Sequence, residues 1–101
     1  MPIRDPDVEG FLALLGASRA PRTVEAYRRD LTVLSEYLGK PVSRASLEEL
    51  ERYTASMRAD GLAPTTIARR TAAARSFFRH QQLLGARDDN PAAAVKLPRR
   101  P

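Results

Sequence analysis

Residues 61–78 read GLAPTTIARRTAAARSFF, a stretch that combines the end of one helix with the beginning of another. Gly61 can adopt the left-handed conformation that closes a preceding helix, and Pro64 suits the first turn of the next one. Apolar or small residues then recur every three or four positions, which is the spacing of one buried helical face. The stretch therefore predicts a helix that begins at Pro64 and ends near Leu84. Its predicted inward residues are Ile67, Thr71, Ala74 and Phe78, with Phe77 beside them.

Three further helices are predicted on the N-terminal side of this stretch. Residues 6–15, 21–39 and 46–60 each carry apolar side chains at helical spacing between proline, serine or glycine boundaries. Ser46 and Glu49 have the spacing of a capping box, in which each side chain satisfies the backbone N–H of the other residue. No segment shows sustained alternation of apolar and polar residues, so we expect no β-sheet. The inward residues predicted on these helices are Val8, Phe11, Leu12, Leu15, Val24, Tyr27, Leu31, Leu34, Leu38, Leu47, Leu50, Tyr53 or Thr54, and Met57.

The C-terminal residues have a different composition. Residues 90–101 contain several prolines, a short run of alanine and a terminal basic pair. This composition is typical of a linker. We therefore predict an all-α fold, a compact four-helix bundle in residues 1–89, with a C-terminal linker tail in residues 90–101 that leaves the bundle.

The charge is basic and unevenly distributed along the chain. Lysine and arginine number 17 against 12 acidic residues, and the net charge is +5. Almost all of these basic residues are arginine, whose planar fork suits phosphates and guanine edges, although a GC-rich genome would also enrich arginine and alanine. Residues 61–87 hold five arginines and no acid, whereas residues 44–60 hold three bases and four acids. A genomic bias does not predict this segregation, which favours a nucleic-acid partner.

Several classes of protein are excluded. The chain has no cysteine, so disulfides and cysteine-ligated metals are ruled out. It also has no apolar run long enough to span a bilayer and no signal peptide. We expect an intracellular protein with no membrane partner, no small-molecule ligand, no metal and no cofactor.

The outward faces of the helices predicted at 21–39 and 64–84 share a pattern. Each has a threonine in its first turn, an arginine nearby and a small residue between them. Threonine hydroxyls and backbone N–H groups at a helix start can bind phosphate, and Arg69, one turn after Thr65, could reach a base edge. Each of these residues taken alone is better explained as an ordinary exposed or capping residue, and it is the repetition of the pattern on two helices that favours binding.

Three stretches resemble a known family. TVEAYRRDL at 23–31 resembles the T-l-x-a-Y-r-r-D-L stretch of phage-integrase-type tyrosine recombinases, and 61–78 is similar to their G-l-s-p-x-T-i-x-R-r-l-s-a-l-R-s-F-y stretch. NPA at 90–92 and LP at 97–98 resemble the N-P-a…l-P segment that leads to the catalytic domain. The three stretches occur in the family's order and spacing over roughly residues 8–98, and they most resemble the Xer-type group.

The resemblance implies a SAM-like core-binding domain that forms a clamp around DNA with a C-terminal catalytic domain. It implies double-stranded DNA at a recombination half-site, that catalytic domain and other recombinase protomers as partners in DNA recombination and integration. It would place the protein in the bacterial cytoplasm, and at the nucleoid when bound to DNA. The second and fourth helices would face the major groove. The candidate DNA-binding residues, from the resemblance and the helix faces together, are Arg22, Thr23, Ala26, Arg29, Thr65, Thr66, Arg69, Arg70, Arg75 and Ser76.

The chain also departs from the family's pattern. Arg70 lies near the core edge of its helix, and Thr71 and Ala74 stand where the family has larger aliphatic residues, which predicts looser packing. The family's catalytic residues, including an H-x-x-R motif, lie in the C-terminal domain, and here His80 is followed by QQL. We therefore expect no catalytic residue in this chain, while the parent protein would be a tyrosine recombinase. A helix-turn-helix regulator, a helical protein-interaction module and an inactive orphan domain that competes for recombination sites remain alternatives.

Overall fold

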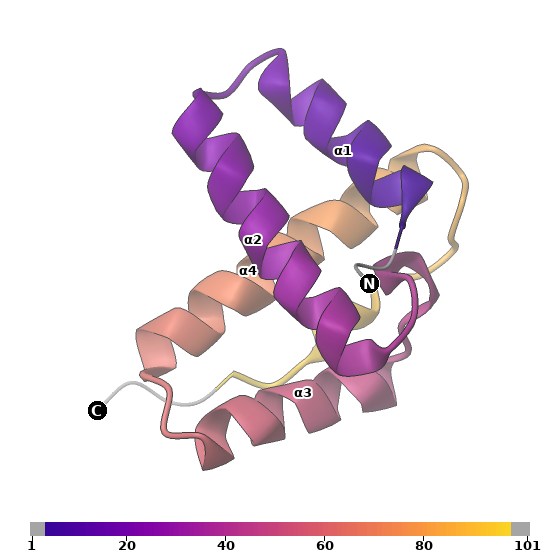
Figure 1. Ribbon diagram of the computed structural model, residues 1–101. Helices are drawn as coiled ribbons and strands as arrows, with labels where there is room; N and C mark the ends of the chain where they lie inside the picture. The colour runs from indigo at the N-terminus through magenta and orange to yellow at the C-terminus, as the bar shows by residue number, and fades with distance from the viewer. Residues whose placement is uncertain (1–3, 98–101) are drawn as a thin grey trace.

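The computed structural model describes residues 4–97 as four α-helices and two short 3₁₀-helices, without a strand in that range (Figure 1). The prediction of an all-α fold with four helices is confirmed, and each predicted helix end lies within one residue of the observed one. The first helix extends one residue past the predicted range, to Gly16, and Ala17 follows it with a right-handed backbone conformation. The elements are α1 Pro6–Gly16, α2 Pro21–Leu38, η1 Val42–Arg44, α3 Leu47–Ala59, α4 Pro64–Leu83 and η2 Pro91–Ala94.

Local signals in the sequence account for these helix boundaries. The Asp5 carboxylate accepts hydrogen bonds from the first-turn backbone of α1, and the predicted capping box between Ser46 and Glu49 is present at the start of α3. The residues after α2 and α3 include Gly39 at φ 68° and Gly61 at φ 79°, in the left-handed region that glycine adopts without a steric penalty.

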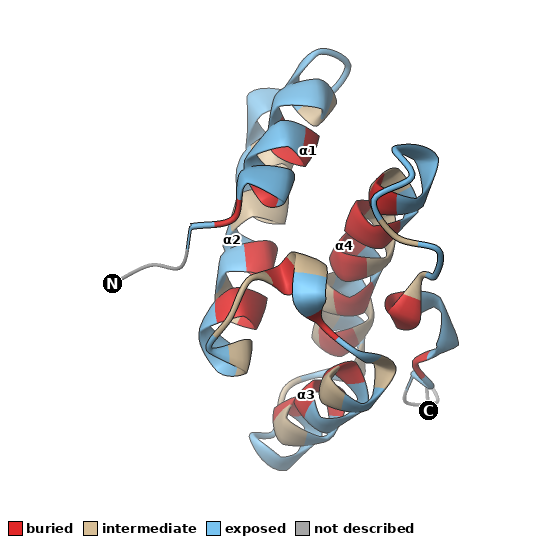
Figure 2. Ribbon diagram, turned by 90° about the vertical axis from the view of Figure 1, so that its right-hand side faces the viewer, coloured by how far each residue is buried: buried red, intermediate tan, exposed pale blue. Residues whose placement is uncertain are grey.

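The core lies along α4, which contacts each of the other α-helices. Figure 2 shows buried positions along the length of α4 and on the faces of its neighbours that turn toward it. Phe77 and Phe78 are fully buried, and the Phe11 ring of α1 lies edge-on to Phe77 with centroids 5.8 Å apart. Most of the predicted inward residues are buried. Leu15, Val24, Tyr27, Leu38 and Leu47 are only half-buried, at the edge of this core.

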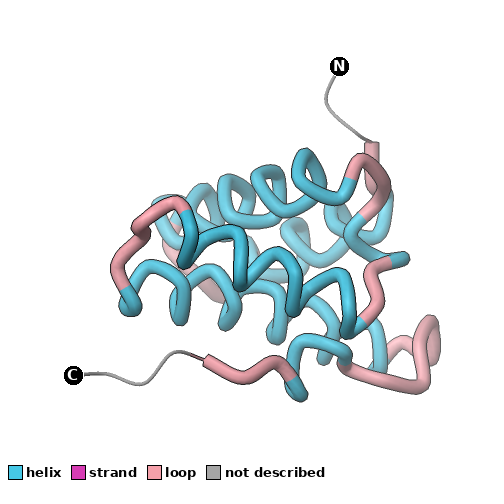
Figure 3. The backbone as a smooth tube through the Cα atoms, turned by 90° about the horizontal axis from the view of Figure 1, so that it is seen from below, coloured by secondary structure: helices cyan, strands magenta, loops and turns pink. Residues whose placement is uncertain are grey.

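The C-terminal segment packs on the bundle, and this corrects the prediction of a linker that leaves it at residue 90. Figure 3 shows the segment running back along the helices. η2 contacts both α3 and α4, Ala92 is fully buried and Val95 is buried beside it. The Asn90 side chain donates a hydrogen bond to the Arg75 carbonyl at 3.0 Å. The boundary between a domain and a linker stays a prediction, and residues 98–101 lie outside the described residues.

Small side chains on α4 explain why the segment docks here. Thr71 and Ala74 line one small cavity together with Ala92 and Val95, so the segment occupies the space that larger residues on α4 would have filled. The cavity that remains has a volume of about 10 Å³, about the smallest that can hold one water molecule. The looser packing predicted at Thr71 and Ala74 is therefore compensated by a distant part of the chain.

Candidate nucleic-acid interface

The two helices predicted to carry the interface pack against each other and begin on the same side of the molecule. α2 and α4 are in contact, and both start on the left of Figure 1 and run toward the right. Their first turns are therefore accessible from one direction, which is the arrangement that a single duplex would require.

Both helices begin without a side-chain cap. Their N-cap residues are Ala20 and Ala63, Pro occupies the first helical position in each, and neither first turn holds an acid. Thr23 N and Thr66 N each donate to the N-cap carbonyl at 3.0 Å. Within residues 4–97, no hydrogen bond is made by the backbone N–H of Arg22 or Thr65. These starts therefore keep the positive end of the helix dipole available to an anion.

The predicted residues on α2 are accessible to different degrees. Arg22 and Arg29 are exposed, and neither forms an ion pair with any carboxylate of the described chain. Thr23 and Ala26 are half-buried. The helix thus offers two exposed arginines without an ion-pair partner in residues 4–97, and the exposed Glu25 lies between them.

Arg69 on α4 is exposed, as its place on the outward helix face predicts, but it also has a partner on α2. Its Nη1 donates to Asp30 Oδ2 of α2 in an ion pair. The Asp30 side chain is only 6% exposed, whereas that of Arg69 is 50% exposed. In the first turn of α4, which precedes Arg69, Thr65 is exposed and Thr66 is half-buried. The structure therefore brings Arg69 to the junction of the two helices instead of leaving it on an isolated face.

Asp30 is a site residue that the sequence analysis missed. It follows Ala26 by four positions and Thr23 by seven, so it shares their side of α2. An acid on the face of a helix expected to meet phosphates was the signal that could have revealed it.

Arg70 lies at the seam between α3 and α4, near the core edge as the wheel predicts. It is half-buried beside Tyr53, and the Arg70 Nε and the Tyr53 hydroxyl are both buried without a hydrogen bond of ordinary geometry in the described chain. Burial raises the pKa of the Tyr53 hydroxyl, and the nearby Arg70 guanidinium offsets part of that rise. Arg70 is thus packed beside residues of α3.

Arg75 and Ser76 form a third group on α4. Both are half-buried, and together with Ala72, Arg79 and two residues of the C-terminal segment they line an open groove of about 340 Å³. Arg75 Nε donates to the Ala92 carbonyl at 3.4 Å, so this arginine also fixes η2. The predicted set therefore separates into the helix starts with Arg69, the seam at Arg70 and this groove.

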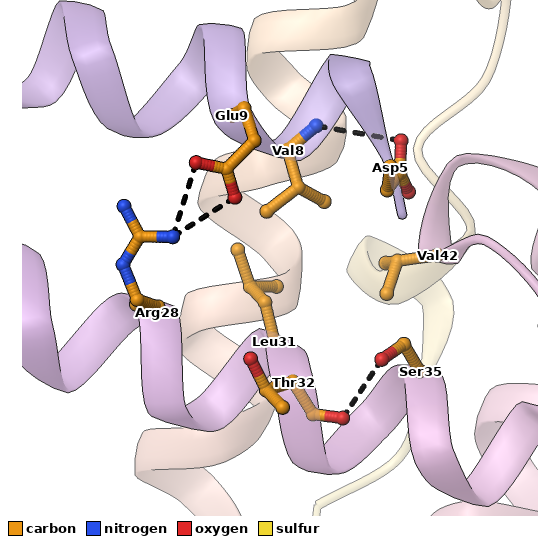
Figure 4. Close-up of a pocket in the computed structure, with 8 residues that line it drawn as sticks. All are labelled: Asp5, Val8, Glu9, Arg28, Leu31, Thr32, Ser35 and Val42. Carbon is orange, nitrogen blue, oxygen red and sulfur yellow. Dashed lines mark hydrogen bonds and ion pairs between the residues drawn. The ribbon is translucent and has the colours of Figure 1, made fainter. Parts of the chain in front are cut away.

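A second small pocket lies between α1 and α2 (Figure 4). Arg28 and Glu9 both line it, and Arg28 Nη1 donates to both carboxylate oxygens of Glu9, at 3.0 and 2.9 Å. The volume of the pocket is about 40 Å³, far below the several hundred Å³ typical of a small-molecule site. Residues 4–97 contain no cluster of three potential metal ligands, and none of their helices is long and apolar enough to cross a membrane.

Comparison with known proteins defines the class. Residues 8–82 match the family described as phage integrase, N-terminal SAM-like domain, and the chain belongs to that family. The predicted resemblance and the SAM-like integrase fold are therefore confirmed.

Individual relatives agree with this class. Tyrosine recombinase XerC of Chromohalobacter salexigens is 38% identical over 98 residues, covering 93% of this chain and 33% of that protein. Tyrosine recombinase XerD of Brucella suis biovar 1 is 37% identical over 98 residues, covering 92% of this chain and 32% of that protein. The integrase from mycobacterium phage Brujita superposes with a TM-score of 0.82 at 26% identity, over 97% of this chain and 34% of that one. The chain spans about a third of the length of these relatives.

Proposed function

We propose that this chain binds double-stranded DNA through the face formed by the starts of α2 and α4, as the N-terminal DNA-binding part of a site-specific tyrosine recombinase. The names of the relatives supply the reaction class. The main structural support is that α2 and α4 both begin without a side-chain cap or a first-turn acid, on the same side of the molecule. In the full recombinase, these residues would hold a recombination half-site while a catalytic domain and further protomers act on it.

The chemistry of the face fits a phosphate backbone. The N–H groups of Arg22 and Thr65 are free to bind phosphate oxygens, and the exposed guanidinium groups of Arg22 and Arg29 can pair with neighbouring phosphates. Such contacts displace counterions from DNA, so affinity should fall steeply with salt.

A salt titration with a matched variant tests the proposal. For the wild-type chain and a duplex, log affinity should fall against log salt with a slope of about −3 or steeper. The double variant Arg22→Ala/Arg29→Ala should make the slope shallower by nearly two units, because each lost phosphate contact removes about 0.9. Fluorescence anisotropy of a labelled duplex measures both.

The control removes the same charge elsewhere. Arg44→Ala/Arg52→Ala replaces exposed arginines on η1 and α3, and its slope should stay close to that of the wild type. Equal losses in the two double variants would mean that only net charge matters, and a flat salt response of the wild type would remove the proposed interface.

A further inference from the structure

The two buried carboxylates of the described chain have different partners. Asp5 accepts hydrogen bonds from the backbone N–H groups of Asp7, Val8 and Ser43, so its charge is used to hold the fold. For Asp30, the hydrogen bond found among residues 4–97 comes from the Arg69 guanidinium. A buried carboxylate requires such a partner, because removal from water penalises its charge. Asp30 is therefore paired with an arginine whose side chain is half exposed.

The pairing leaves a defined part of Arg69 free. Only Nη1 contacts Asp30, and within the described residues neither Nε nor Nη2 makes a hydrogen bond. The Nε–H and Nη2–H groups form a parallel donor pair along a separate edge of the planar guanidinium. This is the fork geometry that matches the O6 and N7 acceptors of guanine in the major groove.

We propose that Asp30 is a positioning residue that holds the Arg69 guanidinium at the junction of α2 and α4, with its free edge directed at a base pair. The inference rests on the proposed DNA-binding function. A guanidinium anchored at one end loses less rotamer freedom when it binds, so its contact is selective in geometry. Its charge is already balanced by Asp30, so Arg69 contributes to sequence preference more than to general affinity.

This arrangement predicts an unusual pair of effects for Asp30→Asn. The freed Arg69 can follow any phosphate, so binding to an arbitrary duplex should be retained or tightened, with a salt slope steeper by about 0.9. Discrimination between a preferred and a scrambled duplex should fall about tenfold, the value of one lost bidentate base contact. A residue that only supports the fold would not separate these two quantities.

The experiment uses duplexes with a randomised central segment, because the target sequence is not known. The wild-type chain enriches a preferred duplex from this pool, and anisotropy then gives its affinity relative to a scrambled duplex for each variant. Arg69→Ala should lose discrimination to the same extent as Asp30→Asn, and the double variant should lose no more than either, because the two residues act as one unit.

Glu9→Gln is the matched control. It raises the net charge by the same amount and breaks the Arg28–Glu9 ion pair of 2.9 Å, which also joins α2 to a neighbouring helix. Discrimination should stay at the wild-type value in this variant. If Asp30→Asn keeps full discrimination as Glu9→Gln does, Asp30 only supports the fold and the inference is wrong, while the proposed function stands. A wild-type chain that binds no duplex overturns the proposed function and the inference together.

Two further measurements test the inference even if Asp30→Asn fails to fold. Arg69→Lys keeps the charge but has no planar fork, so discrimination should again fall about tenfold, and unchanged discrimination would overturn the inference. In the free wild-type chain, the nitrogen-15 heteronuclear NOE of Arg69 Nε should match that of ordered backbone, whereas that of Arg22 should be low. An Arg69 side chain as mobile as that of Arg22 would contradict positioning by Asp30.

Discussion

The four helices of this domain begin in two different ways. α1 and α3 start with side-chain caps, from Asp5 and Ser46, and carry acids in their first turns. α2 and α4 start after alanine, have no side-chain cap and have no acid in the first turn. The first two starts are completed from within the chain, and the other two leave backbone N–H groups and dipole charge available to an external anion.

Under the proposed DNA-binding function, the difference separates helix starts that stabilise the fold from helix starts that would bind DNA. A missing side-chain cap costs about 1 kcal/mol per helix, and a proline at the first helical position offsets part of that cost because its ring is already in the helical conformation. Pro21 and Pro64 occupy that position in α2 and α4. These two helices are thus kept intact without any side chain that would compete with phosphate.

The largest expected effect, on the free energy of unfolding, comes from removing the side-chain cap of α1. Asp5→Ala removes the cap of α1 and the acceptor for Ser43 N at 3.2 Å, so the free energy of unfolding should fall by about 2–3 kcal/mol. Urea denaturation measures this change. Asp7→Ala, which removes an exposed acid in the same turn, should cost no more than about 0.5 kcal/mol. Equal losses would show that the cap of α1 has no special role.

The next effect comes from making α4 start as α3 does. Thr65→Glu places an acid in the first turn, so the free energy of unfolding should stay constant or rise by about 0.5 kcal/mol. Duplex affinity should fall about tenfold, because the carboxylate repels phosphate and competes for the same N–H groups. Ala55→Glu adds the same charge at an exposed site on α3 and should weaken binding much less. If both variants bind alike, the start of α4 does not meet the duplex.

The smallest effect concerns the acid of the capping box on α3. The hydrogen-bonded ion pair with Lys40, at 2.8 Å, is the largest influence that lowers the pKa of Glu49. A lowered pKa in the folded state stabilises the fold above the ordinary pKa of glutamate, and this contribution is lost as pH falls through the lowered value. Lys40→Met should therefore raise the pKa of Glu49, as observed by carboxyl carbon-13 NMR, and should cost below about 0.5 kcal/mol at neutral pH. The stability difference from the wild type should disappear in acid, and a difference that persists there would have another origin.

Local signals explain how much of the fold could be predicted. Proline, serine and glycine lie at or next to the helix ends, so they indicate where each helix begins and stops. The apolar spacing then assigns the core face of each helix separately. The Arg69–Asp30 pair could not be found in this way, because it depends on how α2 crosses α4. A helical wheel treats every neighbouring helix as a uniform apolar surface, so it cannot place a buried carboxylate opposite Arg69.

The docked C-terminal segment escaped prediction for a related reason. Residues 91–95 have no helical spacing of their own, and their few apolar side chains are buried only because α4 has small residues at the matching positions. The candidate DNA-binding residues were predicted from the family resemblance together with the helix faces, and they stay predictions, although the structure shows which of them share one side.

The docked segment also fixes the backbone up to Lys96 relative to the bundle. Arg58 Nη2 donates to the Lys96 carbonyl at 3.3 Å, so the backbone up to this residue turns with the bundle as one piece. A tether that pivoted at Asn90 would have up to roughly 20 Å of additional reach, from the extended length of the residues now docked. The described chain therefore reaches its last residues at one defined flank of the bundle, beside α3 and α4.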